Sequence, residues 1–430
     1  MTSSPGTTDR PPGGLLRWHR DFRLFWIGET TSQLGTSVSR IALPLVAITT
    51  LHASTVQIGA LAATTWLPWL LIGLPAGALV DRLPARPLMV VCNIVSIVSF
   101  AGVAVAAWLD VLTMAQLFTV ALVAGTAGVF FETAYQIYLR DLLERDLLPE
   151  GNAKLQGSAA AAGVAGPGLG GIIAQAFGAV LGLLLDTVTF VVSTICLLAS
   201  RPGHRRADGA RRTGGLLRAI GEGLRLVARD PYLRTFTVYG AASNLALNAY
   251  QALLVVFLVR DLGVATGTAG LVIAAMTLGG VAGAALATRV VRRFGTGFGV
   301  LVCQLGVPFA LLIPLAGPGA RLAFPVVGGV ALSAAIVSAN VIKGSWRQSY
   351  CPGAILGRVT VTAQFLNYGT IPLGALIGGA LGTALGVRPT IWIGVGALTL
   401  CGLILLTGPL RRHRDLPEHP EPVAVAAGGG

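Results

Sequence analysis

Charged residues are scarce in this chain. Only 11% of its 430 residues are Asp, Glu, Lys or Arg, whereas about 25% is typical of a soluble domain. A water-soluble globule of this length could not cover its surface with so few charges, and 54% of the residues are hydrophobic. The composition therefore argues against a soluble enzyme, a secreted disulfide scaffold and a disordered chain. It predicts an integral membrane protein.

Several signals of other protein classes are missing. The five cysteines lie far apart, without the spacing of a metal site or a disulfide framework. No Gly-x-x-x-x-Gly-Lys-Ser/Thr loop is present, which argues against ATP-driven transport within this chain. The first twenty residues contain no apolar core before a cleavage site, so no signal peptide is predicted. We expect neither an enzyme nor a bound metal or cofactor.

Lysine is nearly absent, and arginine supplies 29 of the 31 basic residues. These arginines lie in short polar breaks between apolar runs rather than in one patch. Basic residues concentrate on the cytoplasmic side of membrane proteins, so the net charge of +13 indicates topology and anionic lipid, not nucleic acid. Of the 31 basic residues, 26 fall on the side that contains both chain ends. Both termini are therefore predicted to be cytoplasmic.

Twelve apolar runs are each long enough to cross a bilayer, which takes about 20 residues in a helix. Their length and continuous apolar character exclude a transmembrane barrel, whose strands are short and alternating. The sequence predicts an all-α membrane protein with spans at residues 24–50, 57–80, 87–109, 113–139, 155–176, 178–200, 235–259, 266–288, 296–317, 322–346, 361–384 and 388–409.

The spans form two groups of six around the longest polar insert. Ala76-Gly77-Ala78 near the end of the second span is echoed 206 residues later by Ala282-Gly283-Ala284 in the eighth. Such internal duplication is typical of secondary transporters. We therefore predict two six-helix halves at 24–200 and 235–409, with cytoplasmic segments at 1–23, 201–234 and 410–430. The linker 201–234 contains an amphipathic stretch that we expect on the membrane surface.

A basic loop follows the second span. Small residues around Gly77 would let the second span approach a neighbouring helix closely. Asp81 is suited to cap a helix N-terminus, and Arg82 and Arg86 to pair across the cytoplasmic face. The run from Gly77 to Arg86 resembles the signature loop between helices two and three of the major facilitator superfamily, although a proline follows Arg86 where a basic residue is typical. The alternative is an ordinary basic turn.

The fifth span contains the run Gly166-Pro167-Gly168-Leu169-Gly170-Gly171. The proline removes a backbone hydrogen bond and bends the helix, and the glycines permit close contact with a neighbour. The run is similar to the core of a motif that drug/proton antiporters of the superfamily carry in helix five. Generic helix packing is the alternative, because the upstream glycine spacing departs from the full motif.

Further runs resemble one bacterial branch of the superfamily, the macrolide- and enterobactin-exporter-like efflux proteins. They are Phe130–Gln136, Glu150–Leu155, Asp186–Phe190, Arg347-Gln348 and Leu356–Val359, the last of which includes Arg358. The resemblance covers about residues 20–410 and implies two halves built from 3+3 inverted helix repeats. The chain departs from the branch at Cys92-Asn93, where an acidic residue shortly followed by arginine is expected.

Polar side chains recur at helical spacing in several spans. Residues three or four apart share a helix face, so each set forms one polar stripe. The stripes are strongest in the first, fourth, seventh and tenth spans, the four that the resemblance places around a central cavity. The candidate substrate-cavity residues are Gln33, Arg40, Gln136, Asn244, Asn248, Gln251, Asn340 and Lys343, with Asn367 and Tyr368 from the eleventh span.

Ionisable side chains inside a bilayer are costly and usually functional. Glu132 and Glu29 are the candidate proton-coupling residues, with Lys343 or Arg40 as a cationic partner in one state. Glu29 and Arg40 share a helix face but stand about 16 Å apart along the axis, too far for a salt bridge. The alternative is a static buried ion pair that locks two helices. Asp186 is a third candidate, with capping of a helix start as its alternative role.

The combined prediction is a proton-coupled exporter in the bacterial inner membrane that works by alternating access as a monomer. Its substrate would be a hydrophobic small molecule such as an antibiotic, a drug or a secondary metabolite, and its other partners protons and membrane lipid. An importer or lipid flippase of the same fold is one alternative, and a non-transporting membrane sensor or scaffold is another. The two glutamates suit a cationic substrate, whereas Arg40 and Lys343 suit an anionic one, so the substrate's charge stays open.

Overall fold

The computed structural model describes residues 14–80, 82–144, 146–200, 216–351, 353–412 and 414–417. These residues are predominantly helical and contain no β-strand. Several predicted features lie outside the described residues, namely Asp81 and the segments 1–13, 201–215 and 418–430. The side chain of Arg358 is not described either.

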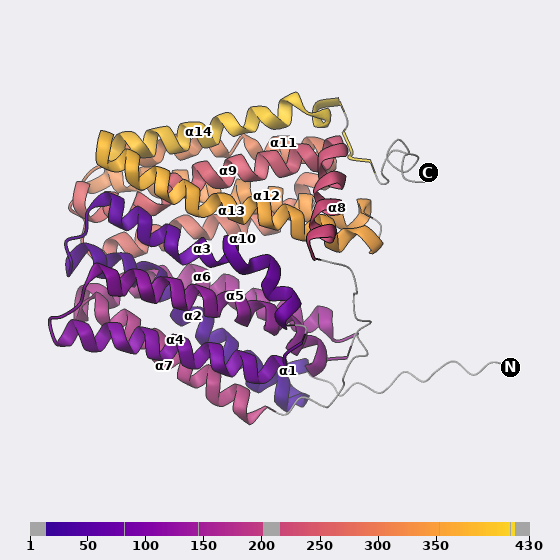
Figure 1. Cartoon of the computed structure of the whole chain (residues 1–430). Helices are drawn as coiled ribbons and strands as arrows, with labels where there is room; N and C mark the ends of the chain where they lie inside the picture. The colour runs from indigo at the N-terminus through magenta and orange to yellow at the C-terminus, as the bar shows by residue number, and fades with distance from the viewer. Residues whose placement is uncertain are drawn as a thin grey trace.

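Long helices lie side by side in a bundle, as Figure 1 shows. The first half contains α2 (Arg20–Thr49), α3 (Thr55–Val80), α4 (Ala85–Trp108), α5 (Met114–Leu142), α6 (Leu148–Phe177) and α7 (Ala179–Ala199). The second half contains α9 (Pro231–Val256), α10 (Thr266–Phe294), α11 (Thr296–Gln304), the 3-10 helix η2 (Val307–Leu315), α12 (Ala323–Tyr350), α13 (Gly353–Leu385) and α14 (Val387–Thr407). The shorter elements are α1 (Leu15–Trp18), the π-helix η1 (Phe257–Asp261) and the 3-10 helices η3 (Gly319–Leu322) and η4 (Pro409–Arg412).

Every predicted span coincides with one of these helical segments. Among the described residues, eleven segments are both long and apolar enough to cross a bilayer. At 30 residues α2 is long enough, but it is not one of the eleven because it carries several polar residues. The predicted all-α membrane fold is confirmed, with α2 as a polar helix packed inside it.

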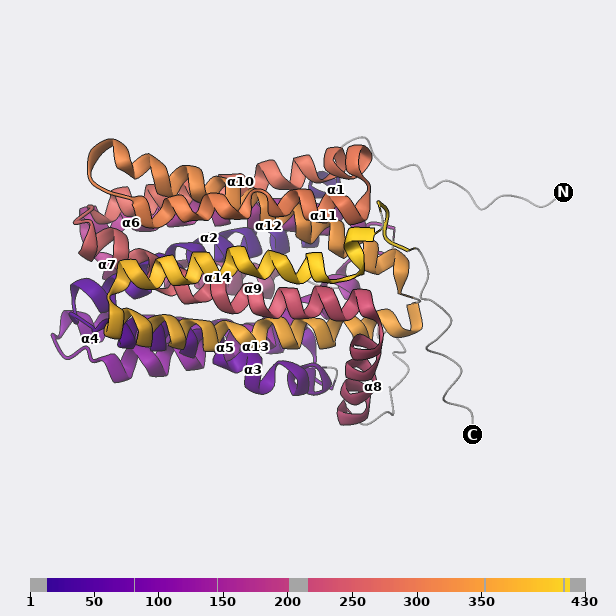
Figure 2. The same cartoon turned by 90° about the horizontal axis from the view of Figure 1, so that it is seen from above.

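Contacts between helices divide the bundle into two halves. In the first half α2 packs against α6 and α7, and α4 packs against α5 and α7; in the second half α9 packs against α13 and α14, and α10 against α12. The most extensive contacts between the halves are made by two helix pairs, α3 with α13 and α6 with α10. Figure 1 shows the first half below the second, and Figure 2 shows the two joining pairs near opposite edges of the bundle.

The two halves share an apolar core at only one end. We call the end at which α2 begins and α14 ends the terminal end, and the opposite end the distal end. At the distal end one buried cluster joins residues of both halves, among them Leu45, Leu253 and Ile391. At the terminal end each half has its own cluster, which includes Tyr138 in the first half and Trp346 in the second. The halves are therefore packed together distally and separate at the terminal end.

Glycines make the distal contact possible. A Cβ atom on Gly59 of α3 would lie 2.6 Å from the Cα atom of Gly379 in α13, and one on Gly171 of α6 would lie 2.8 Å from that of Gly270 in α10. Small residues of this kind let helix backbones approach closely. The close approach predicted at Gly77 is not made in this conformation, because a Cβ atom there would meet open space.

Arg86, from the predicted basic loop, binds the end of a neighbouring helix. It donates from Nε to the carbonyl oxygen of Leu197 at 2.8 Å and from Nη2 to that of Leu198 at 2.6 Å. Both acceptors lie in the last turn of α7, where carbonyl groups lack helical partners. Arg86 thus caps α7, whereas Arg82 is exposed.

The helix α8 (Leu216–Arg229) belongs to the predicted linker. It crosses the terminal end of the second half, where it packs on α13 and α9 (Figures 1 and 2). Asp230 then caps α9 by accepting hydrogen bonds from the amides of Tyr232 and Leu233, each at 2.9 Å. This cap starts α9 at Pro231, slightly before the predicted span.

Replacing Arg86 by alanine should leave two carbonyl groups at the end of α7 without their donor. Hydrogen bonds to charged groups contribute about 1.5–3 kcal/mol each, so we expect a clear fall in the melting temperature of the detergent-solubilised protein. Arg82→Ala is the matched control and should leave the melting temperature unchanged, because Arg82 is exposed. Equal effects of the two substitutions would contradict the capping role.

Candidate functional site

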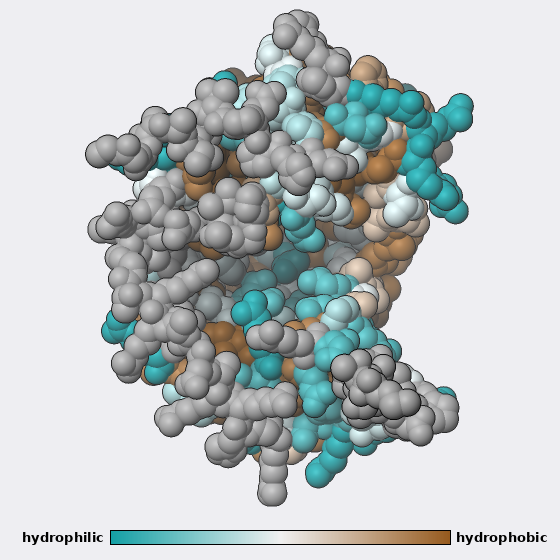
Figure 3. Space-filling model, turned by 90° about the vertical axis from the view of Figure 1, so that its right-hand side faces the viewer, coloured by the Kyte–Doolittle hydropathy of each residue, from teal (hydrophilic) through white to brown (hydrophobic). Residues whose placement is uncertain are grey.

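The molecule is hollowed between its two halves at the terminal end. Figure 3 shows this face, with hydrophilic residues inside the hollow. Arg40 and Glu132 are exposed, although each lies in a long helix and is largely surrounded by protein atoms. Side chains that are both deep and exposed mark a water-accessible space, which we call the central cavity.

The predicted polar stripes lie on α2, α5, α9 and α12. Gln136 lies one helical turn from Glu132 on α5, and both side chains are exposed. Gln251 of α9 and Asn340 of α12 are exposed as well. The remaining candidate cavity residues are partly exposed: Gln33, Asn244, Asn248, Lys343, Asn367 and Tyr368.

Glu29 is a buried carboxylate of α2, with 7% of its surface exposed. Its Oε1 accepts a hydrogen bond from Nε2 of Gln33 at 2.8 Å. Its Oε2 is buried and has no hydrogen-bond partner among the described residues. Glu29 and Glu132 lie near enough to interact electrostatically, so the structure brings together the two predicted carboxylates. Burial of a carboxylate oxygen without a partner is energetically costly.

Arg40 acts on two carboxylates from different helices. It interacts electrostatically with Glu132 of α5 and with Asp186 of α7. In the part of the chain that the structure describes, no ion pair within 4.0 Å joins Arg40 to either of them. The guanidinium group therefore lies near the exposed carboxylate of Glu132 and the buried carboxylate of Asp186, but it forms a salt bridge with neither.

Asp186 lies inside α7 and is 1% exposed. The alternative role of a helix cap is wrong, because α7 begins at Ala179 after Gly178 and Asp186 is two turns further on. The Oγ1 atom of Thr189 donates to its Oδ1 at 3.2 Å, and Gly35 of α2 packs directly against this pair. Its Oδ2 is buried without a partner among the described residues.

Lys343 lies on the wall formed by the second half. Its Nζ atom stands 5.0 Å from the ring centroid of Tyr239, whose hydroxyl donates to Oε1 of Gln304 at 2.9 Å. Its electrostatic partners are Arg347 and Cys303 of the same half. The predicted pairing of Lys343 with a glutamate is therefore not made in this conformation, and Arg40 is the cation near the carboxylates.

Two tryptophans that the sequence did not single out lie beside the predicted Tyr368. Trp66 and Trp69 of α3 place their ring centroids 6.1 Å and 5.7 Å from that of Tyr368 in α13. Tyr368 also interacts electrostatically with Glu132. In an apolar span the two tryptophans resemble ordinary packing residues. Their spacing of three, which puts both on one helix face, is the signal that could have identified them.

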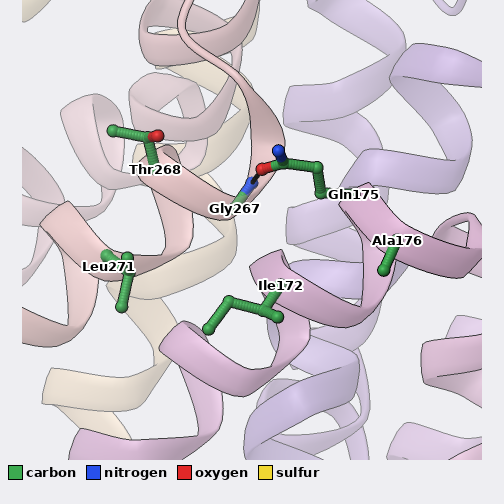
Figure 4. A pocket seen from close by; sticks show the side chains of 6 residues that line it. All are labelled: Ile172, Gln175, Ala176, Gly267, Thr268 and Leu271. Carbon is green, nitrogen blue, oxygen red and sulfur yellow. Dashed lines mark hydrogen bonds between the residues drawn. The ribbon is translucent and has the colours of Figure 1, made fainter.

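The glycine-proline run of α6 packs on both halves near the distal end. Gly170 lies against the carbonyl oxygen of Val38 in α2, while Gly171 lies against α10 of the other half. Close by, Oε1 of Gln175 accepts a hydrogen bond from the amide of Gly267 at 3.0 Å. Figure 4 shows this bond at a shallow pocket lined by Ile172, Gln175, Ala176, Gly267, Thr268 and Leu271.

Two helical halves around a polar cavity that opens at one end define a membrane transporter of the major facilitator type. A solved nucleoside transporter has the same fold, with a TM-score of 0.70, 13% identity, and coverage of 91% of this chain and 99% of that one. A bacterial homologue of the iron transporter ferroportin, solved in an inward-facing state, gives a TM-score of 0.71 at 14% identity over 92% of this chain and 99% of that one.

The chain belongs to the transmembrane secretion effector family of the major facilitator superfamily, whose model matches residues 16–423. A relative from Mycolicibacterium fortuitum, the multidrug efflux pump Tap, is 27% identical over 410 residues, which cover 92% of this chain and 98% of the relative. The pump of the same name from Mycobacterium tuberculosis H37Rv is 29% identical over 395 residues, covering 89% and 92%. The predicted superfamily is confirmed, and the protein is a multi-pass transporter of the bacterial inner membrane, not an enzyme.

A cysteine placed in the central cavity should react with a hydrophilic maleimide, because its thiol is accessible to water. Gln136→Cys is the test position, and Ala134→Cys on the same helix is the control, since Ala134 is 0% exposed. We expect labelling on the order of tenfold faster at position 136. The five native cysteines are buried or half-buried, so unsubstituted protein supplies the background. Equal rates at the two positions would contradict a water-accessible cavity.

Proposed function

We propose that this protein exports hydrophobic small molecules of the drug class in exchange for protons. The names of the mycobacterial relatives as multidrug efflux pumps support drug export. The observation that carries proton coupling is the pair of neighbouring carboxylates, Glu29 with an unpartnered buried oxygen and Glu132 exposed to the central cavity.

In this proposal the terminal end faces the cytoplasm. Basic residues concentrate on the cytoplasmic side of membrane proteins, and most of the arginines that the structure describes lie at the terminal end. The central cavity is then open to the cytoplasm and closed to the outside. That is the state in which an exporter takes up its substrate from the cell interior.

The parts that move in this proposal are the two six-helix halves that the sequence predicts. The halves 24–200 and 235–409 would each move as a body, with 201–234 as the cytoplasmic tether between them and 1–23 and 410–430 as tails. Opening the distal end requires the glycine contacts between α6 and α10 and between α3 and α13 to loosen. Because the same cavity residues then face the other side, a single site serves both states.

Arg40 is suited to couple proton release to this movement. A guanidinium near a carboxylate favours its ionised form, and Arg40 acts on Glu132 in the cytoplasm-facing state. Arg40 and Glu132 belong to the same half, so movement of the halves leaves the spacing of their backbones unchanged. A turn of the long Arg40 side chain away from Glu132 in the outward-facing state would let Glu132 take up a proton from outside. Asp186, which is sealed from the cavity at 1% exposure, would act through Arg40 rather than by contact with substrate.

The proposal predicts that coupled export depends on the carboxylates of Glu132 and Glu29. Ethidium efflux would be measured in cells that lack their major pumps, with and without a protonophore. Wild-type efflux should be protonophore-sensitive, and Glu132→Gln should reduce it by about tenfold or more, as loss of an essential proton-transfer group does. Glu29→Gln should also reduce efflux, because it removes the second carboxylate of the pair.

Glu144→Gln is the matched control, because Glu144 is an exposed glutamate outside the cavity helices' polar stripes. It should export as wild type at equal membrane expression. Efflux that survives both cavity substitutions would refute the assignment of coupling to these carboxylates. Protonophore-insensitive wild-type efflux would refute proton coupling itself.

The aromatic side chains of Trp66, Trp69 and Tyr368 should contribute to the binding of flat apolar substrates. Aromatic stacking is worth about 0.5–1.5 kcal/mol beyond area burial. We therefore expect Trp66→Ala and Trp69→Ala each to raise the ethidium concentration for half-maximal efflux by about three- to tenfold. Trp108→Ala is the control, because Trp108 is 70% exposed at the distal end of α4 and should leave that concentration unchanged. Unchanged values for both α3 variants would exclude these rings from the substrate site.

A further inference from the structure

One arginine reaches from the second half into the first at the distal end. Arg260 of η1 donates from Nη1 to the carbonyl oxygen of Ala53 at 2.7 Å and from Nη2 to that of Ile48 at 3.3 Å. Ile48 lies in the last turn of α2, and Ala53 lies in the turn that leads to α3. A single side chain of the second half therefore binds two backbone groups of the first.

The end of α2 leaves these carbonyl groups in need of a donor. The last carbonyls of a helix have no intrahelical partners, and the negative end of the helix dipole attracts a cation. Here the amides of Thr50 and Leu51 both bind the carbonyl of Val46, and the amide of Ala53 binds that of Ala47. The turn closes through His52 at φ 48, in the left-handed region. Arg260 thus caps α2 from the other half of the protein.

Local structure positions Arg260 for this contact. It lies in the five-residue π-helix Phe257–Asp261. Short π-helical segments are rare in proteins, and those that occur are often found at functional sites. Phe257 and Leu258, at the start of the same segment, are each 0% exposed and anchor it in the distal cluster. The guanidinium group presents a planar fork of donors, which a lysine cannot reproduce at two acceptors.

A second arginine at the same end makes a contact that stays within one half. Arg388 of α14 donates from Nη2 to the carbonyl oxygen of Ala316 at 3.1 Å, and its guanidinium carbon lies 5.4 Å from the ring centroid of Phe257. Both partners belong to the second half. Arg388 therefore matches Arg260 in chemistry and depth but does not join the halves.

We propose that Arg260 is a positioning residue that latches the distal ends of the two halves together and so favours the state with the cavity open at the terminal end. Opening the distal end must break both of its hydrogen bonds, which are stronger than neutral ones because the donor is charged. The glycine contacts and the Gln175–Gly267 bond close the same end but carry no charge. The inference rests on alternating access alone, and neither proton coupling nor the substrate enters it.

The latch is tested by the distance between the distal ends of the halves. Phe177→Cys on α6 and Leu385→Cys on α13 are suitable spin-label sites, because these side chains are 73% and 53% exposed. Pulsed electron paramagnetic resonance then gives the distance distribution in detergent or nanodiscs, with label on unsubstituted protein as background. The parent pair spans the bundle from α6 to α13 and should show mainly one distance, that of the closed distal end. Arg260→Gln should raise the fraction of a longer distance by about threefold or more.

Arg388→Gln in the same labelled pair is the control and should leave the distribution unchanged, because its bond lies within one half. Arg260→Lys should give an intermediate distribution, since lysine keeps the charge but not the fork. The lysine variant also tests the latch if the glutamine variant does not fold. A distribution for Arg260→Gln that superimposes on the parent would overturn the proposal. So would an equal shift in Arg388→Gln, which would indicate general loosening of the distal end.

Discussion

The contact between the two halves at the distal end depends on backbone approach, and the rest of the site depends on that contact. Where Gly59 meets Gly379 and Gly171 meets Gly270, any side chain would hold the helices apart. With the distal ends closed, the halves diverge towards the terminal end, where each packs its own apolar cluster. The space between them is the central cavity, and it supplies the water that polar side chains inside a membrane protein require.

The charged groups of the cavity are divided between its two walls. Glu29, Glu132 and Arg40 belong to the first half, while Lys343 stays with Tyr239 in the second. This division separates the proposed proton-binding region from the opposite wall. The proposed movement of the halves would therefore change the surroundings of these groups without breaking a tight salt bridge. At the distal end Arg260 reverses the pattern, because its charge is bound directly to the other half.

The helical periodicity of polar residues is a local property that can be read in the sequence. Glu132 and Gln136, four apart on α5, share a helix face, and both are exposed. Other features could not be read because they depend on a partner remote in sequence. Arg86 binds carbonyls more than a hundred residues away in α7, and Asp186 lies near Arg40 of α2 instead of capping the start of its own helix. The tryptophans of α3 gain meaning only beside Tyr368.

The sequence by itself determined that the protein is a helical membrane protein with its spans in two halves, because hydropathy and helical spacing are local properties of the chain. It also singled out the ionisable residues, since each is exceptional within an apolar run. Only the tertiary structure decided which end of the bundle is closed, that Arg40 rather than Lys343 lies near the carboxylates, and that Arg260 joins the halves. Those outcomes depend on which helices meet, and that is set by packing between segments far apart in the chain.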